Sequence, residues 1–376
     1  MSRGLERQVN PKIAALVILL VIAAVQAWWW RAFIWRPKSP TPRPKANMMQ
    51  MPPGPAQETG RKDVAVETIA GDPEPGCADG PGRDARFDAP TGIAIGANGV
   101  LYVADSRNHR IRIVRPDGET TTLAGSTAGY RDGPVRTARF QSPCGIAVDE
   151  SGRVYVADTA NHRIRLIDNG EVRTLAGGDA GFASGRGAAA RFRYPTAIVL
   201  THRPAKTLLV ADCGNRRLRT VGLDGSVQSG TLLPSAPLSA ALGVGGTGWE
   251  SPLPDGASIA RTGPAISGIH SALKSLSIAH PGVVLPLGPE TRLLADASQG
   301  ALLLVEGTTA TVLAGGIQSP GSMLGWRDFS GDQALFGRIG GIVQDDAGRI
   351  YVSDTDANCI RRVTVPGLIR RKEAGP

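Results

Sequence analysis

Short apolar runs separated by turn residues recur along most of the chain. Each run is three to five residues long, rich in Val, Ile, Leu and Tyr, and bounded by Gly, Pro, Asp or Asn. Such runs are typical of β-strands joined by tight turns, and no 3.6-residue periodicity competes with them. One stretch shows the unit in full, with strands expected at 145–148, 154–157, 164–167 and 172–177. The pattern therefore predicts an all-β fold built from four-stranded units.

The unit repeats along the chain, and an aspartate closes its second strand each time. The spacings between these aspartates are 53, 54, 84 and 58 residues, so the fourth unit holds an insertion, placed at about 232–272. A period near fifty residues means that each small unit packs against its neighbours, and four strands per unit predict a β-propeller. Five blades are expected, and a sixth stays open if residues 227–275 hold a worn unit. The closing aspartates are Asp105, Asp158, Asp212, Asp296 and Asp354.

An additional strand is expected before the first unit, at 66–71. The fifth unit has its third strand at 360–363 and lacks an outermost strand of its own after it. We therefore expect the N-terminal strand to complete the last blade, which removes an open edge.

The phrase around the aspartates resembles a known repeat. Residues 104–111 and 157–164 read Ala-Asp-x-x-Asn-His-Arg-Ile, which is similar to the NHL repeat, named for Asn-His-Leu. Residues 211–218 carry the same phrase with Arg for His, and the fifth unit departs further. The fourth unit keeps Asp296 but has Gln, Gly and Ala at 299–301. The resemblance covers about residues 64–365 and implies a propeller that is usually a binding platform and occasionally an enzyme.

Two interpretations of the repeated phrase stay open. In the structural one, the aspartate accepts hydrogen bonds from backbone amides, the Asn adopts a left-handed turn, and the Arg reaches a carboxylate. In the functional one, these side chains surround one face of the propeller and bind a divalent cation or a basic partner. The candidate binding residues are Asp105, Asp158, Asp212, Asp296, Asp354, Arg110, Arg163 and Arg217.

The N-terminal region has a different character. Residues 13–30 form an uncharged run of eighteen residues, which is long enough to cross a bilayer as a helix. A cleaved signal peptide is disfavoured because the run is long and no small-x-small site follows it. Four tryptophans at its end suit the membrane interface: Trp28, Trp29, Trp30 and Trp35. The expected segments are a tail (1–12), a transmembrane helix or signal anchor (13–35), a linker (36–63), the propeller (64–366) and a C-terminal tail (367–376).

Residues 37–60 contain seven Pro and two Gly, which predicts an extended spacer. Three basic residues precede the apolar run and five follow it closely, which by the positive-inside rule favours a cytoplasmic propeller. The order of short tail, anchor, spacer and domain is instead that of exported domains. The orientation expected here is extracytoplasmic, either periplasmic or extracellular.

The net charge of +9 changes the picture only after it is divided along the chain. Residues 1–63 carry ten basic and three acidic residues, a net of +7, which leaves +2 for residues 64–376. The basic segment suits anionic lipid headgroups, and nucleic acid is disfavoured as a partner of the propeller.

The cysteines have no zinc-site spacing, and free thiols are favoured over two disulfides. They are Cys77, Cys144, Cys213 and Cys359.

The sequence offers little for catalysis. Its five histidines match no metalloprotease or triad motif, and no GxSxG, P-loop or dinucleotide fingerprint occurs. We therefore expect a membrane-anchored, non-catalytic platform for a protein partner or a sensed small molecule, with no cofactor. The alternative, implied by the resemblance, is a metal-dependent lyase or lactonase-like hydrolase that gathers metal-binding side chains at the central channel.

Overall fold

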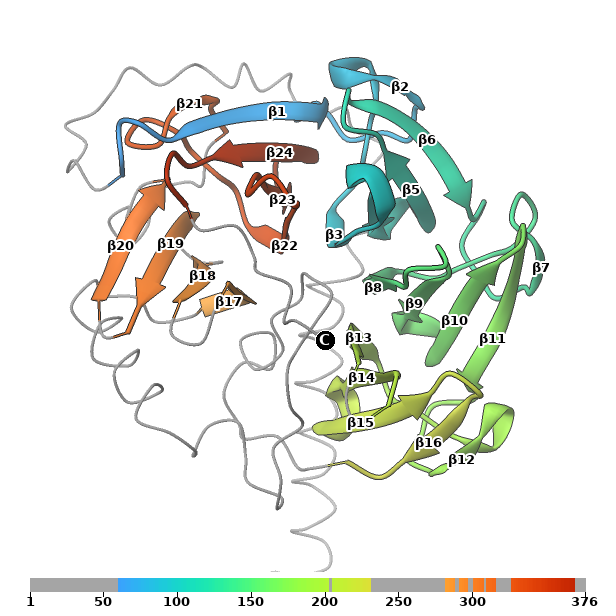
Figure 1. Ribbon diagram of the computed structural model, residues 1–376. Coiled ribbons are helices and arrows are strands. Elements are labelled where there is room, and N and C mark those ends of the chain that lie inside the picture. The colour runs from blue at the N-terminus through green and yellow to red at the C-terminus, as the bar shows by residue number, and fades with distance from the viewer. Residues whose placement is uncertain are drawn as a thin grey trace, which may run out of the picture. The chain divides into compact units, whose positions relative to one another are not determined.

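A computed structural model describes residues 60–202, 205–230, 281–287, 291–296, 300–307, 309–315 and 326–368. All of them belong to one compact unit, residues 53–376. Within these ranges the regular elements are β-strands and short 3₁₀ helices, and the strands form five antiparallel sheets (Figure 1). The predicted all-β propeller with five four-stranded blades is therefore confirmed for the described residues.

Each blade runs from an innermost to an outermost strand (Figure 1). The innermost strands are β3 (Pro90–Ile95), β8 (Pro143–Val148), β13 (Pro195–Thr201), β17 (Pro281–Pro286) and β22 (Ile339–Gln344). The second strands are β4 (Leu101–Asp105), β9 (Val154–Asp158), β14 (Thr207–Asp212), β18 (Thr291–Asp296) and β23 (Ile350–Asp354). The third strands are β5 (Arg110–Val114), β10 (Arg163–Asp168), β15 (Arg217–Gly222), β19 (Ala301–Glu306) and β24 (Cys359–Thr364). The outermost strands are β6 (Glu119–Ala124), β11 (Glu171–Gly177), β16 (Ser226–Gln228), β20 (Thr309–Ala314) and, for the fifth blade, β1 (Ala65–Gly71).

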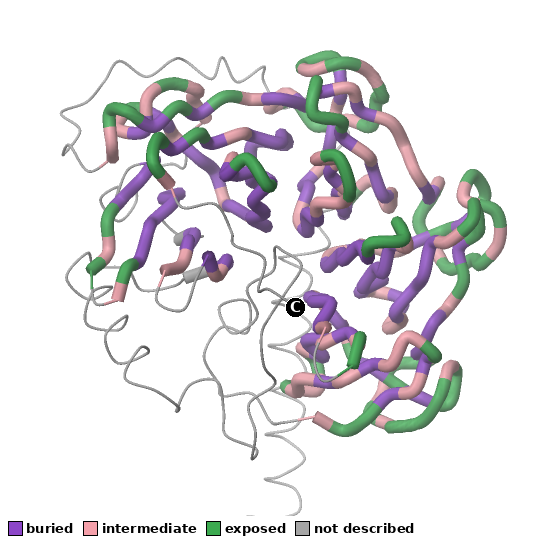
Figure 2. The backbone as a smooth tube through the Cα atoms, viewed as in Figure 1, coloured by how far each residue is buried: buried purple, intermediate pink, exposed green. Residues whose placement is uncertain are grey.

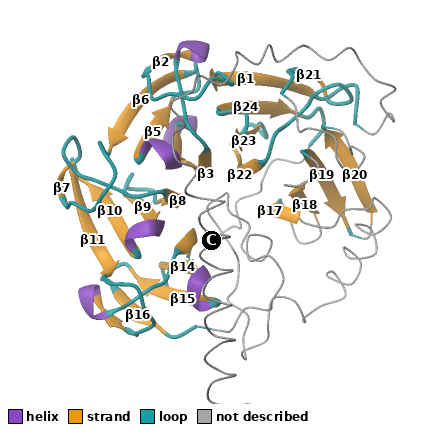
Figure 3. Ribbon diagram, turned by 180° about the vertical axis from the view of Figure 1, so that it is seen from behind, coloured by secondary structure: helices purple, strands orange, loops and turns teal. Residues whose placement is uncertain are grey.

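Shorter elements decorate the blades, and the sequence did not predict them. Two-residue strands pair with the outermost strand of four blades: β2 (Gly80–Pro81), β7 (Gly133–Pro134), β12 (Gly185–Arg186) and β21 (Phe329–Ser330). Short 3₁₀ helices connect strands (Figure 3): η1 (Gly82–Asp84), η2 (Ala97–Gly99), η3 (Ser106–Asn108), η4 (Thr159–Asn161), η5 (Gly187–Ala189) and η6 (Cys213–Asn215).

The fifth blade is completed from the N-terminal side, as predicted. Strand β1 pairs antiparallel with β24, and its register places Val66 opposite Val363 and Ala65 opposite Thr364. Val66 and Val363 are both buried, so the pairing also closes the apolar layer of the blade. Because the outer edge of β24 is thus occupied, the blade presents no unpaired long strand there.

Two glycine positions show why the repeated phrase needs this residue. Gly125 directly follows the outermost strand β6 at φ +101°, and a Cβ there would lie 2.5 Å from the backbone oxygen of His109. Gly92 lies in β3, and a Cβ there would lie 2.2 Å from the backbone oxygen of Cys144 in the next blade. The first glycine allows the left-handed exit from the strand, and the second lets neighbouring innermost strands approach closely.

The core consists of apolar clusters shared by neighbouring blades, and Figure 2 shows the buried residues along the strands of each blade. Between the first and second blades, Ala104 and Ile111 belong to one buried cluster with Phe140 and Val156. Strands in the middle of a blade therefore bury both faces, which explains their near-continuous apolar runs. Innermost strands contact one another from β17 through β22, β3 and β8 to β13.

Some expectations fall outside the described residues. These are the possible sixth unit at 227–275 beyond residue 230, the insertion at 232–272, the segment at 13–35 with its four tryptophans, and most of the linker and the C-terminal tail. In the described part of the chain, no helix is long and apolar enough to span a bilayer.

Candidate functional site

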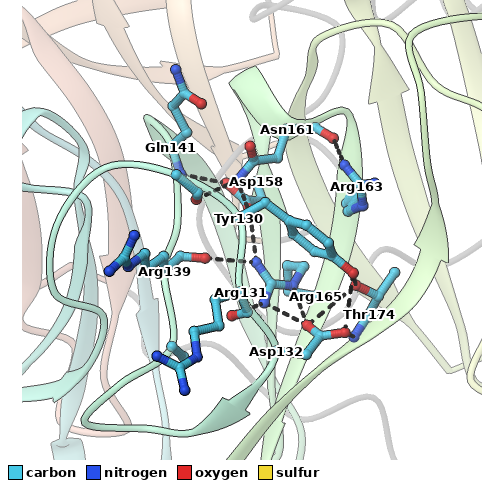
Figure 4. A network of polar contacts seen from close by, with 12 residues as sticks. Tyr130, Arg131, Asp132, Arg139, Gln141, Asp158, Asn161, Arg163, Arg165 and Thr174 are labelled. Carbon is cyan, nitrogen blue, oxygen red and sulfur yellow. Dashed lines mark hydrogen bonds and ion pairs between the residues drawn. The ribbon is translucent and has the colours of Figure 1, made fainter.

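The closing aspartate of the second blade lies inside the blade. Asp158 and Arg165 are both fully buried, and Arg165 Nη1 donates to Asp158 Oδ2 over 2.6 Å (Figure 4). Asn161 Nδ2 donates to the same oxygen over 2.8 Å, and the backbone N–H of Gln141 donates to Oδ1 over 2.8 Å. On burial the carboxylate loses its hydrogen bonds to water. One guanidinium and two further hydrogen-bond donors replace them, as a buried charge requires.

The buried arginine extends this network to the outside of the blade. Arg165 donates to the backbone oxygens of Arg131 and Arg139 and, through Nε over 3.1 Å, to Asp132 (Figure 4). Asp132 in turn accepts from the backbone N–H of Thr174 in β11 over 3.0 Å. One guanidinium therefore connects the turn after the second strand, the loop entering the blade and the outermost strand.

The same arrangement recurs in three other blades. The paired nitrogen and oxygen atoms are 2.8 Å apart for Asp105 and Arg112, 3.1 Å for Asp212 and Arg219, and 3.3 Å for Asp354 and Arg361, all fully buried. In the fourth blade the matching arginine position, seven residues after Asp296, is the buried Leu303. The side chain of Asp296 lies outside the described residues.

The pKa values of these carboxyls follow from burial. Removal from water raises the pKa of Asp105, Asp158 and Asp354 to about 6 and also raises that of Asp212, while the neighbouring arginines act in the opposite direction. At neutral pH the carboxyls stay ionised and paired. The structure therefore places four of the five candidate aspartates away from any surface ligand, in the arrangement that the structural interpretation expects.

Two parts of the structural interpretation were wrong in detail. Arg110 and Arg163 donate to the backbone oxygens of Asn108 and Asn161, and Arg217 donates to that of Gly230, rather than to carboxylates. The carboxylates pair instead with the second arginine of each strand, two residues later. Residues two apart in a strand lie on the same face, and the side chain of this second arginine is buried in the blade. The sequence contains a sign of this second arginine, because β5, β10 and β15 each begin with Arg-x-Arg, but the prediction considered only the first arginine.

The left-handed residue of the turn is His109 or His162 rather than the Asn before it. His109 Nδ1 accepts the backbone N–H of Ser142 over 3.1 Å, and His162 Nδ1 accepts that of Tyr194 over 3.1 Å. In both cases the donor belongs to the next blade, so the imidazole links neighbouring blades. Burial and two nearby arginines lower the pKa of His162, which keeps it neutral and able to accept.

Asn358 replaces the histidine in the fifth blade and keeps its function. Its φ is +53°, and its Oδ1 accepts the backbone N–H of Ala89 in the first blade over 2.9 Å. We call these three contacts, made by His109, His162 and Asn358, the blade latches.

Hydroxyl groups add a second link between blades. Thr159 Oγ1 donates to the backbone oxygen of Pro195 over 2.7 Å, and Thr355 Oγ1 to that of Pro90 over 2.7 Å. Ser106 makes the same contact to Pro143, and Cys213 occupies the equivalent position in the third blade. All four cysteines are free thiols, as favoured from the sequence, and burial raises the pKa of Cys213 to about 11.

Two of the exposed aromatic residues, Tyr130 and Phe182, lie on the same edge of the blades. We call this edge the loop edge; it carries the turns between second and third strands and the two ends of each loop that enters a blade. The opposite edge, which we call the turn edge, carries the turns between first and second strands, the turns between third and fourth strands, and the middle of each entering loop. Tyr130 and Phe182 occupy matching loop positions, and each is 47% exposed. Arg163 lies 3.9 Å from the Tyr130 ring centroid, and Arg217 lies 4.8 Å from that of Phe182. Neighbouring blades thus repeat an aromatic–arginine pair at the surface.

No metal centre emerges from the described residues. Within them, no group of three or more His, Cys, Asp or Glu side chains could hold a metal ion. The second residues of the first three innermost strands are Thr91, Cys144 and Thr196. Hydroxyl and thiol groups thus occupy these positions, and the predicted cation site on one face has no direct support.

The architecture is that of a β-propeller, and the comparisons with known proteins refine this class. Residues 87–114 and 140–165 match the family model described as NHL repeat. They cover the turns that hold the blade latches of the first two blades.

The curated relatives share only part of their length with this chain. Over 92 residues the chain is 41% identical to Protein SUPPRESSOR OF QUENCHING 1, chloroplastic, of Arabidopsis thaliana, covering 24% of this chain and 9% of that protein. Over 119 residues it is 37% identical to NHL repeat-containing protein 2 of Homo sapiens, covering 28% of this chain and 16% of that protein. The chain thus spans less than a fifth of the length of these relatives, and their activities are not carried over to it.

Two solved structures are similar over most of the chain but at low identity. A gluconolactonase from Xanthomonas campestris covers 84% of this chain at 15% identity and a TM-score of 0.46. A streptogramin B lyase covers 80% at 10% identity and a TM-score of 0.44. At these values neither structure bears on the chemistry of this chain.

Proposed function

We propose that this protein is a non-catalytic platform that binds a protein partner on the loop edge of the second and third blades. The observation that carries the proposal is the pair of half-exposed rings, Tyr130 and Phe182, at matching positions of adjacent blades. Exposed aromatic side chains next to arginine are the residues that most often dominate protein interfaces. The network around Arg165 fixes the loop that carries Tyr130, so the surface is preorganised.

Partner capture by the full-length chain tests this proposal. The chain is isolated from solubilised membranes after cross-linking, and co-purified proteins are compared between wild type and the double variant Tyr130→Ser/Phe182→Ser. We expect the double variant to lose the specific partner. The matched control is Phe329→Ser, which removes a ring that is 54% exposed on β21 in the fifth blade. Retention of the same partner by the double variant would contradict the proposal.

An enzymatic alternative receives no specific support from the described residues. A metal-dependent lyase or lactonase-like hydrolase needs metal-binding side chains that converge, and the described residues contain no such group of three or more His, Cys, Asp or Glu. A sensed small molecule needs a concave site of several hundred Å³. The hollow found between the first three innermost strands is lined by aliphatic residues such as Ile146 and Ile198.

We further propose that residues 13–35 anchor the protein in a membrane and that the propeller is extracytoplasmic. The support is the uncharged run at 13–30, its terminal tryptophans and the spacer that follows. Cys77 provides the test because it is the exposed cysteine. A membrane-impermeant maleimide should label the full chain in intact cells, and Cys77→Ser should lose the label. Labelling only after permeabilisation would place the propeller in the cytoplasm.

A further inference from the structure

The loop edge of the second and third blades is strongly basic, although the propeller as a whole is nearly neutral. In the sequence of this edge, residues 126–132, 139–142, 159–163, 178–183, 190–194 and 213–217, seven arginines face two aspartates, a net of +5. The turn edge of the same blades, residues 133–138, 149–153, 168–171, 184–189, 202–206 and 222–226, carries five acidic and five basic residues. The arginines are Arg131, Arg139, Arg163, Arg191, Arg193, Arg216 and Arg217.

These arginines are available to a ligand. Five of them are exposed, and Arg163 and Arg217 are half-buried beside the rings. Of the two aspartates, Asp132 already pairs with the buried Arg165. None of the seven arginines has a carboxylate partner among the described residues, whereas the turn-edge Arg153 and Arg186 pair with Asp149 and Asp224. The loop edge thus presents a field that attracts anions.

The rings select the kind of anion. Arg165 lies 5.0 Å from the Tyr130 centroid in addition to Arg163, and Arg219 lies 4.7 Å from the Phe182 centroid in addition to Arg217. Two guanidinium groups therefore lie against each ring, which leaves less of the ring face for stacking on a nucleic-acid base. The edge of an aromatic ring is positive, and a stacked guanidinium directs its donors outward in its own plane. Both features suit carboxylates.

We propose that the loop edge of the second and third blades binds an extended acidic segment of a partner protein, whose carboxylates pair with Arg163 and Arg217. The proposal rests on the proposed function and names the chemistry of the partner. The repeat of the aromatic–arginine pair in adjacent blades offers two equivalent carboxylate sites for one extended chain. The exposed arginines around them attract the rest of the segment and accelerate its association.

A fluorescent oligoglutamate peptide of about twelve residues is the probe. It is titrated against the full-length protein in detergent at several salt concentrations. The wild-type protein should bind it with an affinity that falls with salt, and Arg163→Gln/Arg217→Gln should weaken binding about tenfold or more. The matched control is Arg115→Gln/Arg136→Gln, which removes the same charge from the turn side of the blades and should change affinity less than about twofold.

The outcomes separate the alternatives. Unchanged peptide binding by Arg163→Gln/Arg217→Gln would overturn the proposal, because the basic segment at 1–63 would then be the binding site. Tighter binding of oligodeoxythymidylate than of oligoglutamate, lost in Tyr130→Leu/Phe182→Leu, would also overturn it in favour of nucleic acid. If a captured partner needs Tyr130 and Phe182 but oligoglutamate does not bind, the proposed function stands and this inference fails.

Discussion

A single buried arginine organises each of four blades. Arg112, Arg165, Arg219 and Arg361 have no exposed side-chain surface, and each pairs with the aspartate that closes the second strand. A buried charge that loses its partner is costly, while replacing both members of a pair with neutral groups is often tolerated. The fourth blade, with Leu303 at the arginine position, shows that the blade accommodates an apolar residue there.

We predict that Arg165→Leu lowers the free energy of unfolding by about 3–5 kcal/mol, because it leaves Asp158 buried and unpaired. Urea denaturation of the solubilised protein measures the change. The double variant Asp158→Asn/Arg165→Leu should recover part of the loss, since the remaining group is neutral. A single variant as stable as the double one would mean that the ion pair is not what the blade depends on.

The latch at His162 predicts a pH dependence. Its pKa is lowered in the folded state from an unfolded value near 6.5, so the folded protein binds fewer protons and the contribution is lost as pH falls below about 6.5. The aspartates Asp105, Asp158 and Asp354 act oppositely, because their pKa of about 6 exceeds the unfolded value of about 3.9. Their contribution therefore grows as pH falls through 6 toward 4.

We predict that His162→Asn removes the histidine part of this dependence. Asn358 shows that an asparagine in the same left-handed conformation maintains a latch without titrating. The aspartate contribution is common to both proteins and cancels in the difference. Melting midpoints of wild type and variant, followed from pH 7.5 to 5, should therefore converge or cross toward acid pH. A constant difference across the range would show that the His162 latch does not titrate in the folded protein.

At the scale of elements, the fifth blade differs from the others because its outermost strand comes from the opposite end of the propeller sequence. Strand β1 contributes buried Val66 and Ala70 to the blade, and β24 would otherwise present an open edge. The first three blades obtain their outermost strands locally. The stability of the fifth blade therefore depends on a long-range pairing.

We predict that replacing residues 64–72 by a Gly-Ser segment of equal length lowers the melting midpoint of the full-length protein and promotes association through the exposed edge of β24. Differential scanning fluorimetry and size-exclusion chromatography measure both effects. A like-sized Gly-Ser replacement within 41–49, in the spacer, is the control for chain flexibility. Equal midpoints for the two variants would contradict the role of β1 in closure.

Strand positions could be predicted from sequence, whereas the partners of charged residues could not. The expected strand at 154–157 differs from β9 by one residue, because turn residues bound each apolar run. The pairing of Asp158 with Arg165 depends on which side chains point into the blade. In sequence, a buried charged residue of a strand cannot be distinguished from one that faces solvent, so the pairing could not be predicted. The latches depend on contacts with another blade, which the local pattern does not contain: the partners are 33 and 32 residues away for His109 and His162, and 269 residues away for Asn358.

At the scale of the whole molecule, the propeller is nearly neutral, yet the second and third blades carry their charge unevenly between the two edges. Dividing the net charge along the chain leaves +2 for residues 64–376, which argued against nucleic acid as a partner of the propeller. The fold brings Arg163, Arg193 and Arg217 to one edge and Asp149, Asp168 and Asp224 to the other. Counting charges along the sequence adds the residues of both edges together. The difference in net charge between the loop edge and the turn edge is therefore seen only when the strand topology is known.

The number of blades is tested by the segment at 232–272, which lies outside the described residues. Its sequence predicts a loop without regular structure. Replacing residues 235–268 by a short Gly-Ser linker should then leave the melting midpoint nearly unchanged, because loop length affects closure entropy only weakly. A large drop in the midpoint would instead indicate a sixth blade.

The pairing of β1 with β24 also sets an order for biosynthesis. The two strands are separated by about 300 residues, so β1 leaves the ribosome long before its partner exists. The first three blades contain all their strands in local sequence and can assemble while synthesis continues. The fifth blade cannot form until residues 359–364 have left the ribosome, and until then β1 has no strand to pair with. A ribosome that stalls before this point releases a chain whose first strand has no partner, which marks it for chaperones and proteases.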